Sequence, residues 1–330
     1  MNKQTISPNL GLDLVRVTEA AAFVAGRWMG RGDEKQANKE AINAMARAFE
    51  TLPIDGRIVI GEEKRLAVST PLDSGKNVGN GNGPAMDVVV DAIDGTALLT
   101  QGLPGAISVA GIAPRNSMWA PYPATHMEKI IVGADAANAL VPECLDAPAA
   151  WTLALVARAK NKAVRDLVVF VLNRPRHRHL IEEIQATGAR VMALSQGDIG
   201  GALMVASHDI NVDILMGTGG VSEGIVAACA VKSLRGGMLG RVIPMDEAEA
   251  EVLKDSQVDC TTILTQEEIV AGCDIYFAAT GITRGALFAG VHYQGTKVEA
   301  ESIVVRCQTG TRRIVQVEHF LHESEIDTSP

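Results

Sequence analysis

The chain has 330 residues, of which 47% are hydrophobic and 4% aromatic, and its formal net charge is −9 at pH 7. The length allows one large domain or two lobes, and the acidic balance excludes a general nucleic-acid or membrane-surface binder, which needs an excess of cations. Scattered cysteines without a Cys-x-x-Cys pair, and the lack of a signal peptide or of an apolar span of about 20 residues, predict a cytoplasmic protein with reduced thiols.

Two helices are expected at the start of the chain. The first covers residues 10–30 and is followed by Gly30 and Gly32, which are typical stop signals. The second covers residues 34–50, where apolar residues recur at helical spacing. Asp33 lies at the joint between them, and spacing alone favours a simple N-cap role for its carboxylate.

A short strand is expected over residues 57–60, and Glu62 follows its end. An acidic residue after a strand is usually solvated, so Glu62 matters only if it meets other carboxylates in space. Residues 63–85 are polar and rich in glycine, which predicts a loop. This loop is neither a P-loop nor a dinucleotide fingerprint, because no Gly-Lys-Ser/Thr follows and no helix opens from it.

The strongest chemical signal is the segment 91–96, Asp-Ala-Ile-Asp-Gly-Thr, which ends an apolar, β-branched run over residues 86–90. That run predicts a buried strand. Asp91 and Asp94 would repel each other and lose hydration there unless a cation or a donor compensates. Hard divalent ions such as Mg²⁺ or Mn²⁺ prefer such oxygen ligands. On spacing alone, a metal site and an Asp-Gly β-turn are about equally supported.

The rest of the chain alternates expected strands and helices, which is typical of α/β layers. An irregular stretch over residues 135–148 contains two prolines and suggests a boundary near residue 145, giving lobes 1–145 and 146–330. The expected strands are 106–113, 129–133, 167–172, 189–194, 211–216, 258–264, 274–280, 302–308 and 312–319, and the expected helices are 176–187, 198–206, 222–234 and 246–254.

The run 174–179, Arg-Pro-Arg-His-Arg-His, is the one basic cluster of the sequence and lies between an expected strand and an expected helix. Cations beside the N–H groups of a helix start form a natural phosphate site. From the residues alone, a phosphate site and a solvated basic turn are about equally supported. A nucleic-acid patch ranks last, because aromatic residues are missing nearby and the chain is acidic.

Glycines in the run 217–220 precede the helix that is expected to begin near Ser222. Backbone N–H groups at such glycines can point at an anion. Glu223 lies in the first turn of this helix, where an acidic residue commonly complements the helix dipole. Closing a metal cluster is its alternative role.

Several motifs occur together in one order, at residues 17–21, 30–33, 58–62, 91–96, 127–129, 174–177, 219–224 and 279–283. In this order they resemble the class II fructose-1,6-bisphosphatases of the lithium-sensitive, metal-dependent sugar phosphatase superfamily, and the chain looks like a divergent member. The resemblance covers roughly residues 10–320. It implies a layered αβαβα sandwich, with an N-terminal metal-binding lobe and a C-terminal sugar-phosphate-binding lobe.

The resemblance also implies an activity. The chain would hydrolyse the 1-phosphate of fructose 1,6-bisphosphate, or also act on sedoheptulose 1,7-bisphosphate, in gluconeogenesis or the Calvin cycle. It would use Mg²⁺ or Mn²⁺ and form a homo-oligomer, either a dimer or a tetramer. Such chemistry requires mainly charge stabilisation, and two cations can both acidify a bound water and stabilise the leaving oxygen.

Site residues are carried over position by position. The metal ligands would be Asp33, Glu62, Asp91, Asp94 and Glu223. Thr96 would orient the attacking water, with Asp91 as the second catalytic residue, because a hydroxyl needs a neighbouring carboxylate to act as a base. The substrate would be held by Asp94, Gly95, Thr96, His126, Arg174, Pro175, Arg176, Gly197, Asp198 and Gly220.

The chain departs from the family pattern at several positions. Ala92 and Asp94 replace a proline and a glutamate, and Lys64 replaces an acid. His126 stands where a substrate-contacting tyrosine is expected, and Gln196 where an aspartate is expected. These departures leave open the exact sugar and the number of metal ions. They also leave open two alternatives, a phosphatase for another substrate such as an inositol phosphate and a catalytically weak sugar-phosphate-binding regulator.

Overall fold

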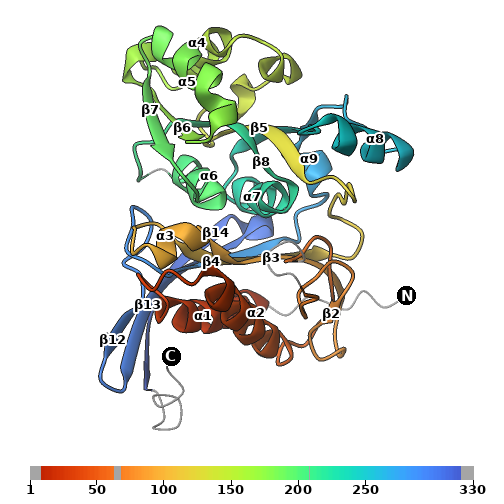
Figure 1. Cartoon of the computed structure of the whole chain (residues 1–330), viewed down its shortest axis with the longest axis vertical. Coiled ribbons are helices and arrows are strands. Elements are labelled where there is room, and N and C mark those ends of the chain that lie inside the picture. The colour runs from red at the N-terminus through yellow and green to blue at the C-terminus, as the bar shows by residue number, and fades with distance from the viewer. Residues whose placement is uncertain (1–8, 63–67, 208, 321–330) are drawn as a thin grey trace. The chain divides into compact units, whose positions relative to one another are not determined.

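The structure is a computed structural model that describes residues 9–62, 68–207 and 209–320. The chain forms two compact units (Figure 1). Unit 1 combines Met1–Ser117 with Asp274–Pro330, and unit 2 is Met118–Cys273. This division differs from the expected lobes 1–145 and 146–330, because strands near the C-terminus pair with the sheet that the N-terminal segment builds.

Unit 1 contains an eight-stranded mixed sheet in the order β12-β13-β11-β4-β3-β1-β2, with β14 paired to β13. β1 and β3 are parallel, whereas β4 is antiparallel to both β3 and β11. Its strands are β1 (Asp55–Ile58), β2 (Asn77–Val78), β3 (Ala85–Asp94), β4 (Ile107–Pro114), β11 (Tyr276–Gly281), β12 (His292–Gln294), β13 (Lys297–Arg306) and β14 (Thr311–Phe320). Its helices are α1 (Leu10–Gly26), α2 (Glu34–Phe49), α3 (Thr96–Thr100) and the short η5 (Cys307–Thr309).

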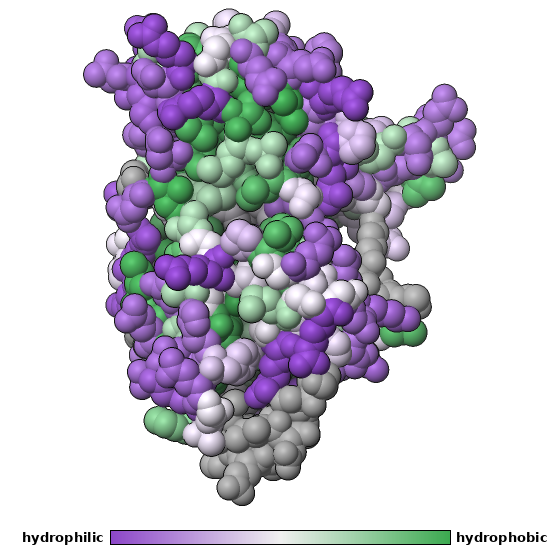
Figure 2. All heavy atoms as spheres, turned by 60° about the vertical axis from the view of Figure 1, so that its left-hand side comes forward, coloured by the Kyte–Doolittle hydropathy of each residue, from purple (hydrophilic) through white to green (hydrophobic). Residues whose placement is uncertain are grey.

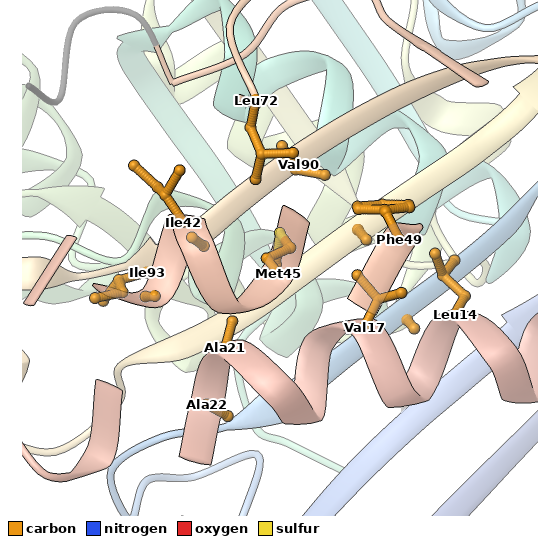
Figure 3. Packing of buried hydrophobic residues seen from close by; sticks show 14 of the residues in the cluster. Leu14, Val17, Ala21, Ala22, Ile42, Met45, Phe49, Leu72, Val90 and Ile93 are labelled. Carbon is orange, nitrogen blue, oxygen red and sulfur yellow. The ribbon is translucent and has the colours of Figure 1, made fainter. Parts of the chain in front are cut away.

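The core of unit 1 lies between α1, α2 and the sheet (Figure 3). The apolar spacing over residues 34–50 predicted which face of α2 is buried, and that face carries Ile42, Met45 and Phe49. Together with Val17 of α1 and Val90 of β3, these side chains pack in one cluster. β3 is therefore held from one face by two helices, which places its C-terminal end at the edge of a dense core.

Unit 2 contains a six-stranded mixed sheet in the order β10-β9-β5-β8-β6-β7. β6 is parallel to β7 and β8, and β5 is antiparallel to β8 and β9. Its strands are β5 (His126–Val132), β6 (Val168–Leu172), β7 (Arg190–Leu194), β8 (Ile214–Gly220), β9 (Gly237–Val242) and β10 (Leu264–Thr265). Its helices are η1 (Ala137–Ala139), η2 (Pro142–Leu145), α4 (Ala149–Ala159), η3 (Val164–Asp166), η4 (Pro175–His177), α5 (Arg178–Ala186), α6 (Asp198–Ala206), α7 (Val221–Ser233), α8 (Glu247–Asp255) and α9 (Gln266–Ile269).

The expected α/β class is confirmed, because both sheets are mixed and packed with helices. Several details differ from expectation, among them α3, β2 and β12, for which no element was expected. The strand expected over 258–264 is wrong apart from its last residue, since the Asp259 carboxylate accepts hydrogen bonds from the backbone of Thr261 and Thr262 and forms a turn. α4 was not expected, although Leu153 is fully buried in the core of unit 2. β8 continues past residue 216, so the glycines of the run 217–220 belong to a strand.

Figure 2 shows one face of the molecule, on which hydrophilic residues cover much of the surface and smaller hydrophobic areas lie between them. Among the residues that the structure describes, no helix is long and apolar enough to cross a bilayer.

A buried carboxyl group lies where α1 meets β13. Glu19 is only 4% exposed, and its Oε1 accepts a hydrogen bond of 3.3 Å from the Ser302 hydroxyl. A chain of hydroxyls continues from Ser302 to Thr280 at 2.8 Å and to Thr18 at 2.7 Å. Burial raises the pKa of Glu19 to about 7, against the opposing effects of the Ser302 hydrogen bond and of Arg16.

This carboxyl group makes stability depend on pH. Its pKa rises from 4.5 to about 7 on folding, so the folded state favours the protonated form. The stabilisation is fully present below the unfolded pKa and is lost as the pH rises through the folded pKa, by at most about 3 kcal/mol. We expect Glu19→Gln, which is neutral at every pH, to remove this loss in urea unfolding from about pH 4 to about pH 8.

The matched control is Glu50→Gln, at an exposed position just after α2, which should keep the pH dependence of the wild type. An unchanged slope in Glu19→Gln would show that Glu19 does not hold its proton in the fold.

Candidate active site

Three buried acidic residues lie on the end of β3 or against it in unit 1. Glu62, Asp91 and Asp94 are each 3% exposed. Glu62 Oε1 accepts a hydrogen bond of 2.7 Å from the backbone N–H of Ala92, so the Glu62 side chain lies against the strand between the two aspartates. Asp91 Oδ1 accepts a bond of 3.1 Å from the N–H of Ile93. Backbone donors thus offset part of the cost of burying these charges.

The chain makes a sharp turn directly after these carboxylates. The pairing of β3 with β4 shifts register between Asp91 and Asp94, as at a β-bulge. Gly95 then adopts a left-handed conformation (φ 91°) as the residue before α3, which a side chain would strain. Thr96 begins α3, and its hydroxyl lies 3.1 Å from Asn38 Oδ1 and 3.2 Å from the carbonyl of Ile93. The turn places a buried hydroxyl next to the acidic strand end.

Asp33 caps the N-terminus of α2, where its Oδ1 accepts a hydrogen bond of 2.9 Å from Gln36 N. This confirms the role that spacing favoured. The preceding loop is tied to the residues of α3, because Gly30 N donates to Leu99 O and Gly32 N to Thr100 O, both at 3.0 Å. Asp33 is therefore held on a loop that contacts α3, and a ligand role for it stays a prediction.

The acidic residues of unit 1 have part of what a divalent metal ion requires. The carboxylate oxygens of Glu62, Asp91 and Asp94 are the ligand type that hard cations prefer. Within residues 9–62, 68–207 and 209–320, however, no group of three His, Cys, Asp or Glu side chains has the spacing to hold an ion. Lys64 lies outside the described residues, and Glu223 belongs to unit 2. The ligand types suit such an ion, and the complete ligand set stays a prediction.

A buried ion pair joins β5 and α6 in unit 2. Lys129 Nζ on β5 donates to Asp198 Oδ2 at the start of α6, with side-chain exposures of 1% and 9%. Gly197 precedes Asp198 in a left-handed conformation (φ 94°) and permits the turn into α6. A Cβ at Gly219 would overlap both charged groups. The glycine on β8 therefore lets the ion pair pack directly against the strand.

The basic cluster is fastened to β8 by hydrogen bonds. Arg176 donates from Nε and Nη2 to the carbonyl oxygen of Thr218, at 3.2 and 2.9 Å. His177 is 3% exposed, and its ring lies 2.7 Å from Leu172 O through Nδ1 and 2.8 Å from Thr218 N through Nε2. Near this cluster a cavity of about 390 Å³ is lined by Asn173, Arg174, Pro175, Arg178, Ile181, Glu182 and Gln185.

The start of α7 brings Glu223 back over the glycines. Gly220 is the residue before α7, and a Cβ there would overlap the Glu223 carboxylate. Glu223 Oε2 also accepts a hydrogen bond of 2.7 Å from the Ser222 hydroxyl. His126 pairs with Gly220 in the register of β5 and β8. Two residues predicted to hold substrate and one predicted metal ligand thus share one strand end.

A polar contact that the sequence did not reveal fixes the side chain of His126. The hydroxyl of Thr125 lies 2.6 Å from His126 Nδ1 and donates to Glu249 Oε1. Partial burial opposes ionisation of Glu249, but the hydrogen bonds from Thr125 and from Met245 N hold the pKa of this carboxyl below its usual value. Lys129 and His177 belong to the motifs at residues 127–129 and 174–177, although neither was predicted as a site residue. Thr125 and Glu249 are 124 residues apart, and no sequence motif connects them.

The predicted residues fall into two groups. Unit 1 contains Asp33, Glu62, Asp91, Asp94, Gly95 and Thr96, and unit 2 contains His126, Arg174, Pro175, Arg176, Gly197, Asp198, Gly220 and Glu223. Within unit 1 the structure brings Glu62 against the Asp91 turn, and within unit 2 it brings Arg176, Asp198 and Gly220 to β8 and its ends.

Acidic groups suited to cations and arginines suited to anions are consistent with a phosphoric monoester hydrolase, which is the class that the family match below defines. Comparison with known proteins agrees. The family described as "Bacterial fructose-1,6-bisphosphatase, glpX-encoded" matches residues 8–319. Two relatives match nearly the whole chain. The chain is 34% identical over 327 residues to "Fructose-1,6-bisphosphatase class 2" of Haemophilus influenzae, and this alignment covers 95% of this chain and 97% of that protein. It is 33% identical over 329 residues to "Fructose-1,6-bisphosphatase 1 class 2" of Escherichia coli, and this alignment covers 96% of each chain. The chain belongs to the class II fructose-1,6-bisphosphatase family.

The buried ion pair should show strong coupling in a double-mutant cycle. Either Lys129→Met or Asp198→Leu leaves one buried charge without its partner, so each should lower the free energy of unfolding by about 3 kcal/mol. The double variant restores neutrality and should lose clearly less than the sum of the two. Urea unfolding of the four proteins measures this. Additive losses would show that the two charges do not depend on each other.

Proposed function

We propose that the protein hydrolyses the 1-phosphate of fructose 1,6-bisphosphate and requires Mg²⁺ or Mn²⁺. The observation that carries this proposal is the buried end of β3 in unit 1, where Glu62 packs against the strand beside Asp91 and Asp94 and the buried Thr96 follows two residues later. Positive charge stabilises buried carboxylates, and hard divalent cations prefer such oxygen ligands. The names of the relatives and the family membership support the choice of sugar.

The residues of unit 1 provide the reacting end of the site. Bound divalent ions, held by Asp33, Glu62, Asp91, Asp94 and Glu223, would supply positive charge for the leaving oxygen and acidify a water. The hydroxyl of Thr96 orients the attacking water, with its own position set by Asn38 Oδ1. Because a hydroxyl is a weak base, Asp91 accepts the proton that the water loses.

The residues of unit 2 hold the rest of the substrate. Arg174, Pro175 and Arg176 bind the distant phosphate, and the two hydrogen bonds that Arg176 donates to Thr218 O fix the plane of its guanidinium. The remaining N–H groups of that guanidinium suit phosphate oxygens, because arginine carries five N–H donors. His126, Gly197, Asp198 and Gly220 contact the sugar, and Gly95 and Thr96 the reacting phosphate.

The proposal includes finer points that rest on the family alone. These are the additional use of sedoheptulose 1,7-bisphosphate, a role in gluconeogenesis or the Calvin cycle, and assembly into a homo-oligomer in the cytoplasm. A catalytically weak sugar-phosphate-binding regulator is the second candidate. It is favoured by the local engagement of two predicted ligands, Asp33 with Gln36 N and Glu223 with the Ser222 hydroxyl.

The direct test is phosphate release from purified protein. The panel contains fructose 1,6-bisphosphate, sedoheptulose 1,7-bisphosphate, fructose 6-phosphate and an inositol monophosphate, each with Mg²⁺, Mn²⁺ or a chelator. We expect release from the bisphosphates that stops with the chelator. Binding of fructose 1,6-bisphosphate without release of phosphate would support the regulator. Phosphate release only from the inositol phosphate would show that the enzyme acts on another substrate.

Two variants test the ligand assignment. Asp91→Asn and Glu223→Gln each replace a charged ligand by a neutral one of the same size, so turnover with metal should fall at least about 100-fold. Thermal unfolding of the metal-free proteins should change little, since the amide oxygens still accept the local hydrogen bonds. Matched controls are Asp55→Asn and Glu251→Gln, both at exposed positions. Wild-type rates in either test variant would show that the residue is not a metal ligand.

A further inference from the structure

Both ring nitrogens of the buried His177 are committed to hydrogen bonds. Nδ1 lies 2.7 Å from the carbonyl oxygen of Leu172, which can only accept, so Nδ1 carries the proton. Nε2 lies 2.8 Å from the N–H of Thr218, which can only donate, so Nε2 is unprotonated. The two contacts together select the neutral Nδ1–H tautomer.

Thr218 of β8 is also bound by Arg176, through its carbonyl oxygen. Thr218 donates its N–H to His177, and its carbonyl oxygen accepts two bonds from Arg176. His177 and Arg176 are neighbours in η4, so this short helix grips one residue of the strand at both of its backbone groups. A Cβ at Gly217 would lie 3.0 Å from His177 Nε2, which shows how closely the ring approaches the glycine run.

The charged groups around the ring shift the pKa of His177 in opposite directions. Burial lowers the pKa of His177, and Arg176 and Lys129 lower it further, whereas the bond to Leu172 O and the charge of Asp198 oppose this. The ring is therefore neutral at pH 7. A second proton on Nε2 would remove the acceptor of the Thr218 N–H and set two donors against each other.

We propose that His177 is a positioning residue for substrate binding, whose neutral ring fixes Thr218 and, through it, the guanidinium of Arg176 in the orientation that receives a phosphate group of the substrate. The role of Arg176 as a phosphate ligand rests on the proposed function. The grip on Thr218 rests on the geometry of unit 2 alone. Acidification that charges His177 releases Arg176 and weakens substrate binding while the chemical step is retained.

The first experiment needs no activity. In protein labelled with ¹⁵N, the ring of His177 should show the Nδ1–H tautomer at neutral pH. On acidification, the amide of Thr218 and the Nε–H of Arg176 should shift with the same midpoint as the ring. His179 lies exposed on α5 and serves as the internal control, since its titration should move neither signal. An Nε2–H tautomer, or an Arg176 signal that ignores the His177 midpoint, would overturn the proposal.

The second experiment uses kinetics on fructose 1,6-bisphosphate. His177→Gln retains an oxygen that can accept from Thr218 N and cannot titrate, so the rise of KM in acid should disappear. His177→Leu has no acceptor and should raise KM about tenfold at every pH, which corresponds to one lost hydrogen bond, with kcat within about twofold. His292→Gln, at an exposed position of β12, should behave as the wild type. A fall of kcat at unchanged KM in His177→Leu would contradict a positioning role.

The two proposals fail in distinguishable ways. If the wild type released no phosphate from any substrate, the proposed function would be wrong, while the resonance of Arg176 would still decide whether His177 positions it. If the wild type were active and the KM of His177→Gln rose in acid as in the wild type, only the positioning role would be lost.

Discussion

The cost of burying like charges dominates the design of unit 1. Glu62, Asp91 and Asp94 are nearly inaccessible to water, and each would repel the others. The backbone of the turn supplies part of the compensation, because Ala92 N and Ile93 N donate to two of these carboxylates. β3 can hold this arrangement because it lies inside the sheet, between β4 and β1, and packs against α1 and α2. The stability of the surrounding core therefore supports a strand end that would be unfavourable in isolation.

In unit 2, by contrast, cationic side chains are held close to the backbone of β8. Lys129 is buried only because Asp198 neutralises it, and both groups press against Gly219. Arg176 and His177 grip the adjacent Thr218. Any side chain at Gly219 or Gly220 would displace a charged group. Gly219 and Gly220 are thus explained by close approach, whereas Gly217 and Gly95 have positive φ angles of 131° and 91°, which favour glycine.

Local pattern predicted the elements whose environment is set by their own sequence. The helix over 198–206 was predicted at its true bounds, and the helix over 34–50 to within one residue, because apolar spacing and the residues at the helix ends agree there. Prediction failed where neighbours in space decide. The pairing of β8 with β5 extends that strand through four residues with three glycines, and propensity alone disfavours such residues in a strand. The division into units was also not predicted. β11 and β13 pair within a sheet that begins about 200 residues earlier in the chain, and a local sequence pattern does not identify so distant a partner.

By itself, the sequence determined the α/β class, the family, the acidic segment at residues 91–96 and the basic cluster at 174–179, because these depend on residue types and short spacings. Only the tertiary structure decided that Glu62 lies against the aspartates, that Asp33 caps a helix, that Thr125 and Glu249 fix His126, and that His177 is neutral. The physical reason is that a side chain's protonation and hydrogen bonds follow from the groups around it, and these groups come from segments that the linear order does not place together.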